Sequence, residues 1–521
     1  MEAVAPAGSA SGEGPRRPRA LVFVGFMGAG KTSAARAVAA ELGTQALDSD
    51  RELEERLGEP IEAFFDRAGE AEFRRVEEEL VVELLARAEG GVVALGGGAL
   101  GSQRVRDALA DHVVVHLEIG VEDAWRRAGG KGRPLARDRG RFEALLADRR
   151  AVYEAAADAT IAPADRGVAV RALPSLLALR DAPSGTRMVW ASSASGDYPV
   201  FLGRGLLRAG FFHPEGPRRF LVTDSNVAGL HRVEADASAA IPPGESEKTL
   251  ARAESVLRAM AAAGMTRDDL VAAVGGGVVG DLAGFCAAVY QRGIRHVQVP
   301  TTLVAQVDSA YGGKTGVDLP EGKNYAGAYH QPSAVLVDPE TLDTLPKEEL
   351  DAGYPEVVKT ALIAGGELWA RVRSGQEPDA ATILRCLRTK LAVVAEDERD
   401  EGRRQVLNLG HTIGHAIEAA TGYRKYRHGQ AVGLGLLCAL RLSRRDPLYL
   451  EVERLFAGKW LPSRCPEVDP EVVLELVKRD KKRRGDMVPF VLVESPGNVT
   501  HGNEVPETHV QAVINEVCSS S

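Results

Sequence analysis

Three histidines lie close together in the C-terminal half of the sequence, in a pattern that could bind a metal ion. His411 and His415 are four residues apart, and His428 follows after a short segment. In a helix, the first two would share one face. Imidazoles suit a divalent metal of the zinc type, and a catalytic zinc site keeps about three protein ligands and one open position. We expect a carboxylate to complete the set, with Glu356 the best candidate; the alternative is that one or more of these are buried structural histidines.

A glycine-rich segment near the N-terminus has the form of a phosphate-binding loop. Residues 25–32 read GFMGAGKT, which fits G-x-x-x-x-G-K-[ST], and the apolar run at residues 20–24 predicts a buried parallel strand before it. Glycines let backbone N–H groups wrap a phosphate chain at the N-terminus of the next helix. Lys31 would reach the outer phosphates, and the Thr32 hydroxyl would bind Mg²⁺. The segment predicts a nucleoside triphosphate site but does not identify the phosphate acceptor.

Polar and glycine residues that could hold the acceptor follow this loop. Asp48 and Asp50 end the next apolar segment, where ligands gather in open α/β sheets. Arg74 could fork onto a carboxylate, and the triple glycine at residues 96–98 would let a ligand touch backbone. Arg133 lies in a glycine-rich segment that predicts a mobile lid. Each of these residues alone is more often part of a salt bridge or a turn.

The second half of the sequence predicts a dinucleotide site and an anionic substrate. Residues 270–281 read as strand, glycine turn and helix, which fits a pyrophosphate at the helix N-terminus, although the strict G-x-G-x-x-G is missing. Residues 297–302 form another strand that ends in hydroxyls. Lys314 and Lys323 stand in glycine-rich, otherwise uncharged segments, where a solvated surface charge is a poor explanation. A phosphorylated or carboxylated substrate explains them better.

From residue 346 onward the pattern changes to longer amphipathic helices. Glu356 and Lys359 are three residues apart, so they would share a helix face. Pro355 beside them fits the first turn of a helix. The basic run at residues 478–484 is short and lies in an acidic domain, so we expect one of its lysines in the active site and the rest in solvent, with no nucleic-acid partner.

Length and composition limit the class of protein. With 521 residues, the chain is too long for one core, and its net charge of −9 gives no reason to expect nucleic acid or an anionic membrane as a partner. The five cysteines are scattered and never spaced as CxxC, which indicates reduced thiols in a cytoplasmic protein. No apolar run could span a membrane. Residues 1–18 read as a disordered tail and residues 181–187 as a linker.

Residues 19–180 resemble shikimate kinase through GFMGAGKT, the DSD pair, EFRR, LGGG and GRPL, in that order. The resemblance implies an α/β P-loop kinase, a parallel sheet with helices on both faces, that phosphorylates the 3-hydroxyl of shikimate with MgATP. It implies Lys31, Asp50 and Arg133 as catalytic residues, with Asp50 as proton acceptor. Ala151 replaces a proline of the family motif, so Arg149 is preferred over Arg150 without excluding it. ATP and Mg²⁺ would contact Gly28, Ala29, Gly30, Lys31, Thr32, Ser33, Asp48 and Arg133; shikimate would contact Asp50, Arg74, Gly96, Gly97, Gly98 and Arg149.

Residues 188–515 resemble 3-dehydroquinate synthase through PGESEK, GGGVVGDLAGF, PTTLVAQVDSAYGGKTGVD, GKN, NLGHTIGHAIE, HGQAV and DKK. The resemblance implies an α/β NAD-binding lobe at residues 188–345 and a mostly helical metal and substrate lobe at residues 346–521. It also implies conversion of the sugar acid phosphate DAHP (3-deoxy-D-arabino-heptulosonate 7-phosphate) to 3-dehydroquinate and phosphate. NAD would be catalytic rather than consumed, and the metal would be Zn²⁺ or Co²⁺.

The same resemblance implies roles for individual residues. The metal ligands would be Glu356, His411 and His428, and the catalytic residues Lys314, Lys359 and His415. NAD would contact Asp224, Asn226, Glu245, Lys248, Gly276, Gly277, Val278, Asp281, Thr301, Thr302, Lys314, Lys323 and Thr344. DAHP would contact Arg292, Asp308, Lys314, Lys323, Asn324, Lys359, Lys390, Arg404, Asn408, His415 and either Lys481 or Lys482.

The sequence therefore predicts a bifunctional enzyme of the shikimate pathway that forms homodimers through its synthase half. One alternative is a small-molecule kinase fused to a polyol dehydrogenase-like enzyme, but such an enzyme has no use for so many phosphate-binding cations. Another is that one half is not catalytic. The intact Lys31, Asp50 and Glu356 argue against that alternative, as do His411 and His428.

Overall fold

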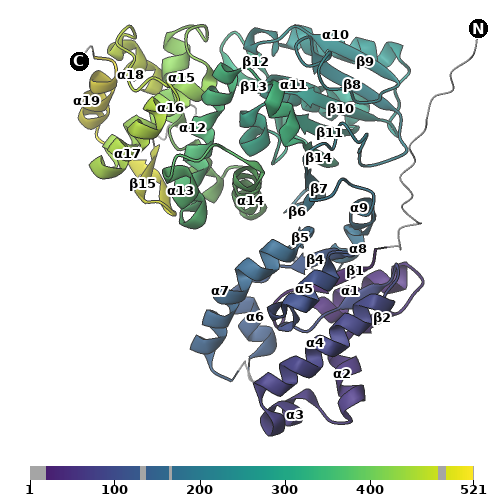
Figure 1. Cartoon of the computed structure of the whole chain (residues 1–521). Coiled ribbons are helices and arrows are strands. Elements are labelled where there is room, and N and C mark those ends of the chain that lie inside the picture. The colour runs from purple at the N-terminus through teal and green to yellow at the C-terminus, as the bar shows by residue number, and fades with distance from the viewer. Residues whose placement is uncertain (1–18, 130–136, 163–166, 479–488, 520–521) are drawn as a thin grey trace, which may run out of the picture. The chain divides into compact units, whose positions relative to one another are not determined.

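The computed structural model describes residues 19–129, 137–162, 167–478 and 489–519. The chain divides into two compact units, Met1–Asp181 and Ala182–Ser521, and each is described by itself (Figure 1). The predicted tail at residues 1–18, the predicted lid residue Arg133, and Lys481 and Lys482 lie outside the described residues.

The first unit is built on a parallel sheet of short, buried strands. Its strand order is β2-β3-β1-β4-β5, and every neighbouring pair is parallel. Every residue of the three central strands is buried, which is why they read as continuous apolar runs. The strands are β1 (Leu21–Val24), β2 (Ala46–Asp48), β3 (Val92–Ala94), β4 (Val113–Leu117) and β5 (Ala159–Ile161).

Helices cross over between these strands, as parallel pairing requires. The longest are α4 and α7, which carry the predicted Arg74 and Arg149. The helices are α1 (Lys31–Glu41), α2 (Ser49–Leu57), α3 (Ile61–Ala68), α4 (Glu70–Arg87), α5 (Gln103–Leu109), α6 (Val121–Ala128), α7 (Arg139–Ala156), α8 (Val168–Arg171) and α9 (Leu173–Ala178).

The second unit begins with a larger sheet of order β6-β7-β14-β11-β10-β8-β9. Only β6 runs antiparallel to its neighbour; the other pairs are parallel, so the carboxyl ends of β8, β10 and β11 meet at one edge. The strands are β6 (Arg187–Ser193), β7 (Gly196–Leu202), β8 (Arg219–Asp224), β9 (Ala237–Ile241), β10 (Leu270–Gly275), β11 (Arg295–Pro300) and β14 (Ala334–Val337). Around them lie α10 (Leu250–Ala262), α11 (Gly277–Val289) and the hairpin β12 (Lys314–Leu319) with β13 (Gly322–Tyr329).

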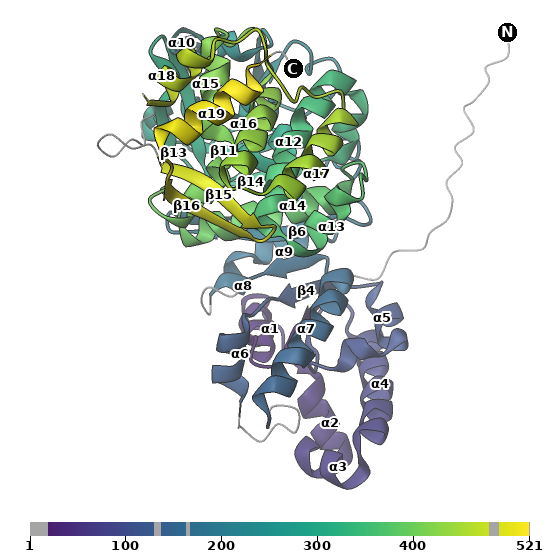
Figure 2. The same cartoon turned by 90° about the vertical axis from the view of Figure 1, so that its left-hand side faces the viewer.

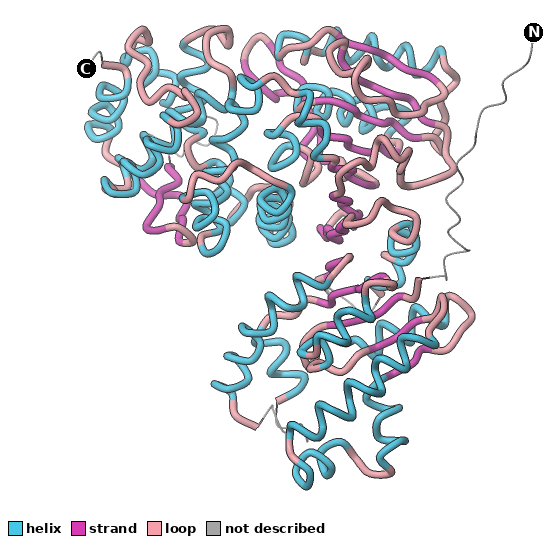
Figure 3. The backbone as a smooth tube through the Cα atoms, in the orientation of Figure 1, coloured by secondary structure: helices cyan, strands magenta, loops and turns pink. Residues whose placement is uncertain are grey.

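Beyond residue 346 the second unit is mostly helical (Figure 3). The β15–β16 hairpin and α19 are the last elements of the chain, and α19 packs beside α16 (Figure 2). None of the helices described is long and apolar enough to cross a membrane. The elements are α12 (Lys347–Ala364), α13 (Gly366–Arg373), α14 (Ala380–Glu396), η7 (Arg403–Asn408), α15 (His411–Ala420), α16 (His428–Leu442), α17 (Asp446–Ala457), α18 (Pro470–Lys478), β15 (Pro489–Ser495), β16 (Asn498–Glu504) and α19 (Glu507–Val517).

One local expectation is wrong. Pro355 does not begin a helix; α12 starts at Lys347 and continues through the proline. A proline inside a helix removes one backbone hydrogen bond and normally costs about 3 kcal/mol. Here every residue from Asp351 to Leu362 is buried, so tertiary packing of α12 outweighs the lost hydrogen bond.

Candidate active sites

The phosphate-binding loop of the first unit joins β1 to α1, as its sequence predicts. Thr32 is the second residue of α1, and its hydroxyl donates to Asp48 Oδ2 at 2.7 Å. The other oxygen of Asp48 caps α2 by accepting from the backbone N–H of Asp50 at 3.1 Å. Lys31 Nζ donates to the carbonyl of Phe26 at 3.2 Å. A hydroxyl and a carboxylate therefore lie side by side next to the loop, which is the oxygen donor set that Mg²⁺ prefers.

Across the cavity from this loop, two arginines lie against the triple glycine. A Cβ added to Gly98 would lie 2.0 Å from Arg74 Nη1, so only glycine lets this guanidinium rest on the backbone. Arg149 Nη1 donates to the carbonyl of Gly97 at 2.9 Å. Arg150 does not line the cavity, whereas Arg149 does. The arrangement presents two guanidinium groups to an anion at the end of β3.

These residues surround one cavity of about 640 Å³. Among the residues predicted for this unit, Ala29 does not line it and Arg133 is not described. Those that do are Gly28, Gly30, Lys31, Thr32, Ser33, Asp48, Asp50, Arg74, Gly96, Gly97, Gly98 and Arg149.

Sequence reasoning missed Glu77, which lines the same cavity. It is 5% exposed, and its Oε2 lies 2.5 Å from Arg74 Nη1. Burial raises the pKa of Glu77, although the charge of Arg74 acts in the opposite direction. The i,i+3 spacing from Arg74 was the available signal, but it did not distinguish a site residue from a surface ion pair.

In the second unit, three helices bring the predicted metal ligands together. Glu356 comes from α12, His411 from the first turn of α15 and His428 from the first turn of α16. Glu356 Oε1 lies 3.6 Å from His411 Nε2 and 3.4 Å from His428 Nε2. The ligand atoms of His411, His415 and His428 lie within 4.8 Å of one another. One carboxylate and imidazole nitrogens thus converge, which fits a divalent zinc-type ion.

The charges around this cluster favour the deprotonated forms of Glu356 and His411, which a metal ligand needs, but favour the protonated form of His428. Glu356 and Lys359 are both 1% exposed, with Oε2 and Nζ 2.5 Å apart. Burial would raise the pKa of Glu356, but Lys359 and the imidazoles hold it well below its usual range. Burial and the charge of Lys359 lower the pKa of His411 to about 3, so this imidazole is neutral. For His428, burial acts to lower the pKa, but hydrogen bonds to Glu356 and Glu418 raise it to about 9.

A close approach between helix backbones sets the spacing of the predicted metal ligands. Gly429 follows His428 in α16, and a Cβ there would lie 1.6 Å from the carbonyl oxygen of Ala352 in α12. Real Cβ atoms essentially never come within 3.0 Å of another heavy atom. The absence of a side chain at residue 429 therefore lets α16 approach α12 closely enough for His428 to reach Glu356.

The residues predicted to bind the dinucleotide line the same cavity as the three histidines. Asp224 ends β8, the glycine turn follows β10, and Thr301 follows β11, so all three lie at one sheet edge. The cavity has a volume of about 920 Å³, and His411, His415 and His428 also line it. Every residue predicted to contact NAD lines it: Asp224, Asn226, Glu245, Lys248, Gly276, Gly277, Val278, Asp281, Thr301, Thr302, Lys314, Lys323 and Thr344.

Comparison with known proteins assigns both units. Residues 27–173 match the shikimate kinase family model, and residues 238–352 and 353–483 match the N-terminal and C-terminal models of 3-dehydroquinate synthase. The 3-dehydroquinate synthase of Acidithiobacillus ferrooxidans is 43% identical over 344 residues, which are 61% of this chain and 94% of that protein. The chain belongs to the 3-dehydroquinate synthase family and carries a shikimate kinase domain before it. It has shikimate kinase and 3-dehydroquinate synthase activities of the shikimate pathway.

Two solved structures resemble the synthase unit. A 2-deoxy-scyllo-inosose synthase complexed with carbaglucose-6-phosphate, NAD⁺ and Co²⁺ is 25% identical; the match covers 63% of this chain and 99% of that one, with a TM-score of 0.56. The 2-epi-5-epi-valiolone synthase of Streptomyces hygroscopicus, with NAD⁺ and Zn²⁺ bound, is 26% identical; the match covers 63% and 98%, with a TM-score of 0.57.

Most of the residues predicted to contact the synthase substrate also line its cavity. The exceptions among those described are Arg292, which is exposed and lies outside the cavity, and Lys359, which lies behind it against Glu356 and Asp308. The residues that line it are Asp308, Lys314, Lys323, Asn324, Lys390, Arg404, Asn408 and His415.

Carboxylates and carbonyls hold the cationic groups of the synthase cavity in place. Asp308 accepts from Lys390 Nζ at 2.7 Å and lies 3.6 Å from Lys359 Nζ. Lys314 Nζ donates to Asp400 at 2.8 Å. Arg404, only 1% exposed, donates to the carbonyl of Gly312 at 3.0 Å. These contacts fix positive charges around one space, which suits a substrate that carries several anionic groups.

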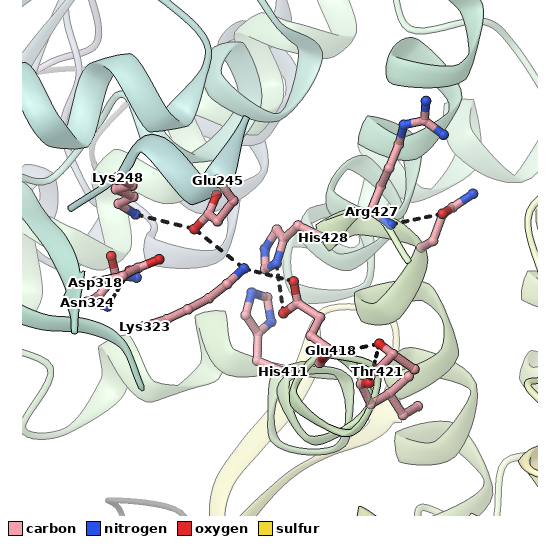
Figure 4. A network of polar contacts seen from close by, with 12 residues as sticks. Glu245, Lys248, Asp318, Lys323, Asn324, His411, Glu418, Thr421, Arg427 and His428 are labelled. Carbon is pink, nitrogen blue, oxygen red and sulfur yellow. Dashed lines mark hydrogen bonds and ion pairs between the residues drawn. The ribbon is translucent and has the colours of Figure 1, made fainter. Parts of the chain in front are cut away.

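A polar network joins the two lobes of the synthase unit beside the histidines (Figure 4). Lys323, on β13 of the α/β lobe, lies 3.0 Å from Glu418 of α15 and 3.4 Å from Glu245. The other oxygen of Glu418 lies 3.3 Å from His428 Nδ1. Glu418 was missed by sequence reasoning, although it ends the NLGHTIGHAIE motif.

Proposed function

We propose that the synthase reaction takes place in the 920 Å³ cavity, with Glu356, His411 and His428 holding Zn²⁺ or Co²⁺ and the edge of the sheet holding NAD. The observation that carries this proposal is that His411, His428 and all the residues predicted for NAD border one space, with Glu356 in contact with both histidines. The ligands bound in the two similar synthases, NAD⁺ with Co²⁺ or Zn²⁺, support it.

The residues of this chain would bind and orient the substrate. When bound, the metal would supply a Lewis acid to a substrate hydroxyl, and NAD would accept and return a hydride. Lys314, Lys390 and Arg404 would hold the phosphate and carboxylate of DAHP, because their positive charges face one cavity and are fixed by hydrogen-bonding partners. His415 and Lys359 remain predicted catalytic residues. Lys359 also forms ion pairs with Glu356 and Asp308.

For the kinase domain, we propose that ATP and Mg²⁺ bind at the loop and shikimate binds against the triple glycine. The Thr32 hydroxyl and Asp48 would serve Mg²⁺, and Lys31 would reach the outer phosphates. Asp50 would accept the proton of the reacting hydroxyl because it lines the cavity between these two regions. Arg74 and Arg149 would hold the shikimate carboxylate as a pair of cationic donors. The lid role of Arg133 remains a prediction.

Both assays on the intact chain test these assignments. Metal-stripped protein, freed of chelator and supplied with Mg²⁺, should still form ADP in a shikimate-dependent reaction but should release no phosphate from DAHP. Zn²⁺ or Co²⁺ should restore phosphate release with about one ion per chain. Full synthase activity in the stripped protein would contradict the proposed metal site.

We further propose a cytoplasmic homodimer, associated through the synthase unit, with lobes divided near residue 345. All five cysteines are buried free thiols, which supports a reducing compartment. A mass measurement in solution should give twice the 55.5 kDa of the chain, and a concentration-independent mass of 55.5 kDa would contradict the dimer.

A further inference from the structure

Glu418 is a buried carboxylate with a different partner on each oxygen. It is 2% exposed and lies on the third turn of α15, the helix that begins with His411. Oε1 lies 3.0 Å from Lys323 Nζ, and Oε2 lies 3.3 Å from His428 Nδ1 (Figure 4). A buried carboxylate is costly unless it is paired, so these two contacts account for its presence in the interior.

The contact with His428 determines which ring nitrogen faces the metal cluster. Nδ1 points to Glu418, while Nε2 lies 3.4 Å from Glu356 Oε1. A metal-ligating histidine commonly donates its other N–H to a carboxylate, which fixes its tautomer and the orientation of the ring. By this geometry, Glu418 would hold the Nδ1–H on the far side and direct Nε2 toward the ion.

The contact with Lys323 connects the same carboxylate to the other lobe. Lys323 lies on the β12–β13 hairpin, far from His428 in sequence, and its ammonium also approaches Glu245 at 3.4 Å. The ring of Tyr423 lies 4.9 Å from the same ammonium. The Glu418 carboxylate therefore contacts both a side chain of the α/β lobe and a predicted metal ligand of the helical lobe.

We propose that Glu418 is a positioning residue of the synthase: it orients His428 for the metal and couples that orientation to the seating of Lys323 from the α/β lobe. This inference rests on the proposed metal site. Because coupling between two contacts is reciprocal, loss of the Lys323 ammonium should weaken metal binding, even though Lys323 is not a ligand.

The test is a direct measurement of metal affinity on the full chain, by chelator competition with Zn²⁺ and by the absorption bands of bound Co²⁺. Glu418→Gln keeps the shape but removes the charge, and it should weaken metal binding about 10- to 100-fold. It should also change the Co²⁺ bands at saturating metal. Lys323→Met should weaken binding about fivefold or more. Glu467→Gln is the matched control, because it removes a carboxylate that pairs with Lys425 in the segment before His428; it should change neither readout.

Each outcome bears on a separate part of the reasoning. If the wild-type protein binds no metal, or if His411→Ala does not abolish the binding, the proposed metal site is wrong. If wild-type binding is intact but Glu418→Gln keeps wild-type affinity and Co²⁺ bands, the positioning role is overturned. If Glu418→Gln weakens binding but Lys323→Met does not, the coupling between lobes is overturned. Thermal unfolding of each variant distinguishes loss of the fold from loss of the ligand set.

Discussion

Replacement of Gly429 by alanine would test whether the helix approach sets the metal geometry. The new Cβ would lie 1.6 Å from the carbonyl oxygen of Ala352. Both partners are backbone within helices, so neither can swing aside as a long side chain would. To restore a separation of 3.0 Å, α16 and α12 must move apart by about 1.4 Å.

That displacement is large compared with what a metal site tolerates. Metal–ligand distances are held to about 0.2 Å of their preferred values, and His428 is next to the substituted residue. We therefore expect His428 to be lost as a ligand, with metal affinity reduced at least about 100-fold. Helix propensity acts in the opposite direction, because alanine is favoured over glycine by about 1 kcal/mol in a helix. A loss of affinity would thus come from the contact, not from a weaker helix.

The assay is metal content after dialysis, with phosphate release from DAHP and shikimate-dependent ADP formation measured on the same preparation. Gly433→Ala is the control, since it lies in the same helix and its added Cβ would lie 3.3 Å from Pro355 Cγ, a contact relieved by a few tenths of an ångström. Gly429→Ala with wild-type metal content and phosphate release would refute the reasoning. Loss of ADP formation would show instead that the damage reaches the kinase domain.

Three further outcomes follow from the two sites. Lys31→Ala should reduce shikimate-dependent ADP formation at least about 100-fold and leave phosphate release from DAHP unchanged, because the phosphate contact belongs to the kinase domain alone; equal loss of both activities would contradict this. Gly98→Ala should displace the Arg74 guanidinium and raise the KM for shikimate about tenfold or more without changing that for ATP, as steady-state kinetics would show. His411→Ala should remove the bound metal and synthase activity while kinase turnover survives, and a metal-replete variant would argue against this ligand.

Many residues of both sites could be predicted because they belong to short sequence motifs. The phosphate-binding loop, the triple glycine and the i,i+4 histidines each encode their geometry within a few residues. Parallel strands bring their carboxyl ends to one edge, so Asp224 and Thr301 line one cavity although they are 77 positions apart in the sequence. For this reason the residues predicted for NAD fall on one cavity.

The residues that were missed depend on tertiary contacts. Asp400 accepts a hydrogen bond from Lys314, although the two residues are 86 positions apart in the sequence. Its backbone has a positive φ of 63°, which no sequence motif predicts. Glu77 and Glu418 look like ordinary helix carboxylates until the fold buries them. Pro355 was placed at a helix start by its local preference, and the burial of α12 overrode that preference.

The buried pair of Glu356 and Lys359 has a consequence for how the ion is acquired. In many small metal-binding domains, the polypeptide folds only when the ion binds. Here an ammonium of the same helix already neutralises the carboxylate, so the ion-free polypeptide can keep its shape. Loading of an ion could then follow completion of the chain.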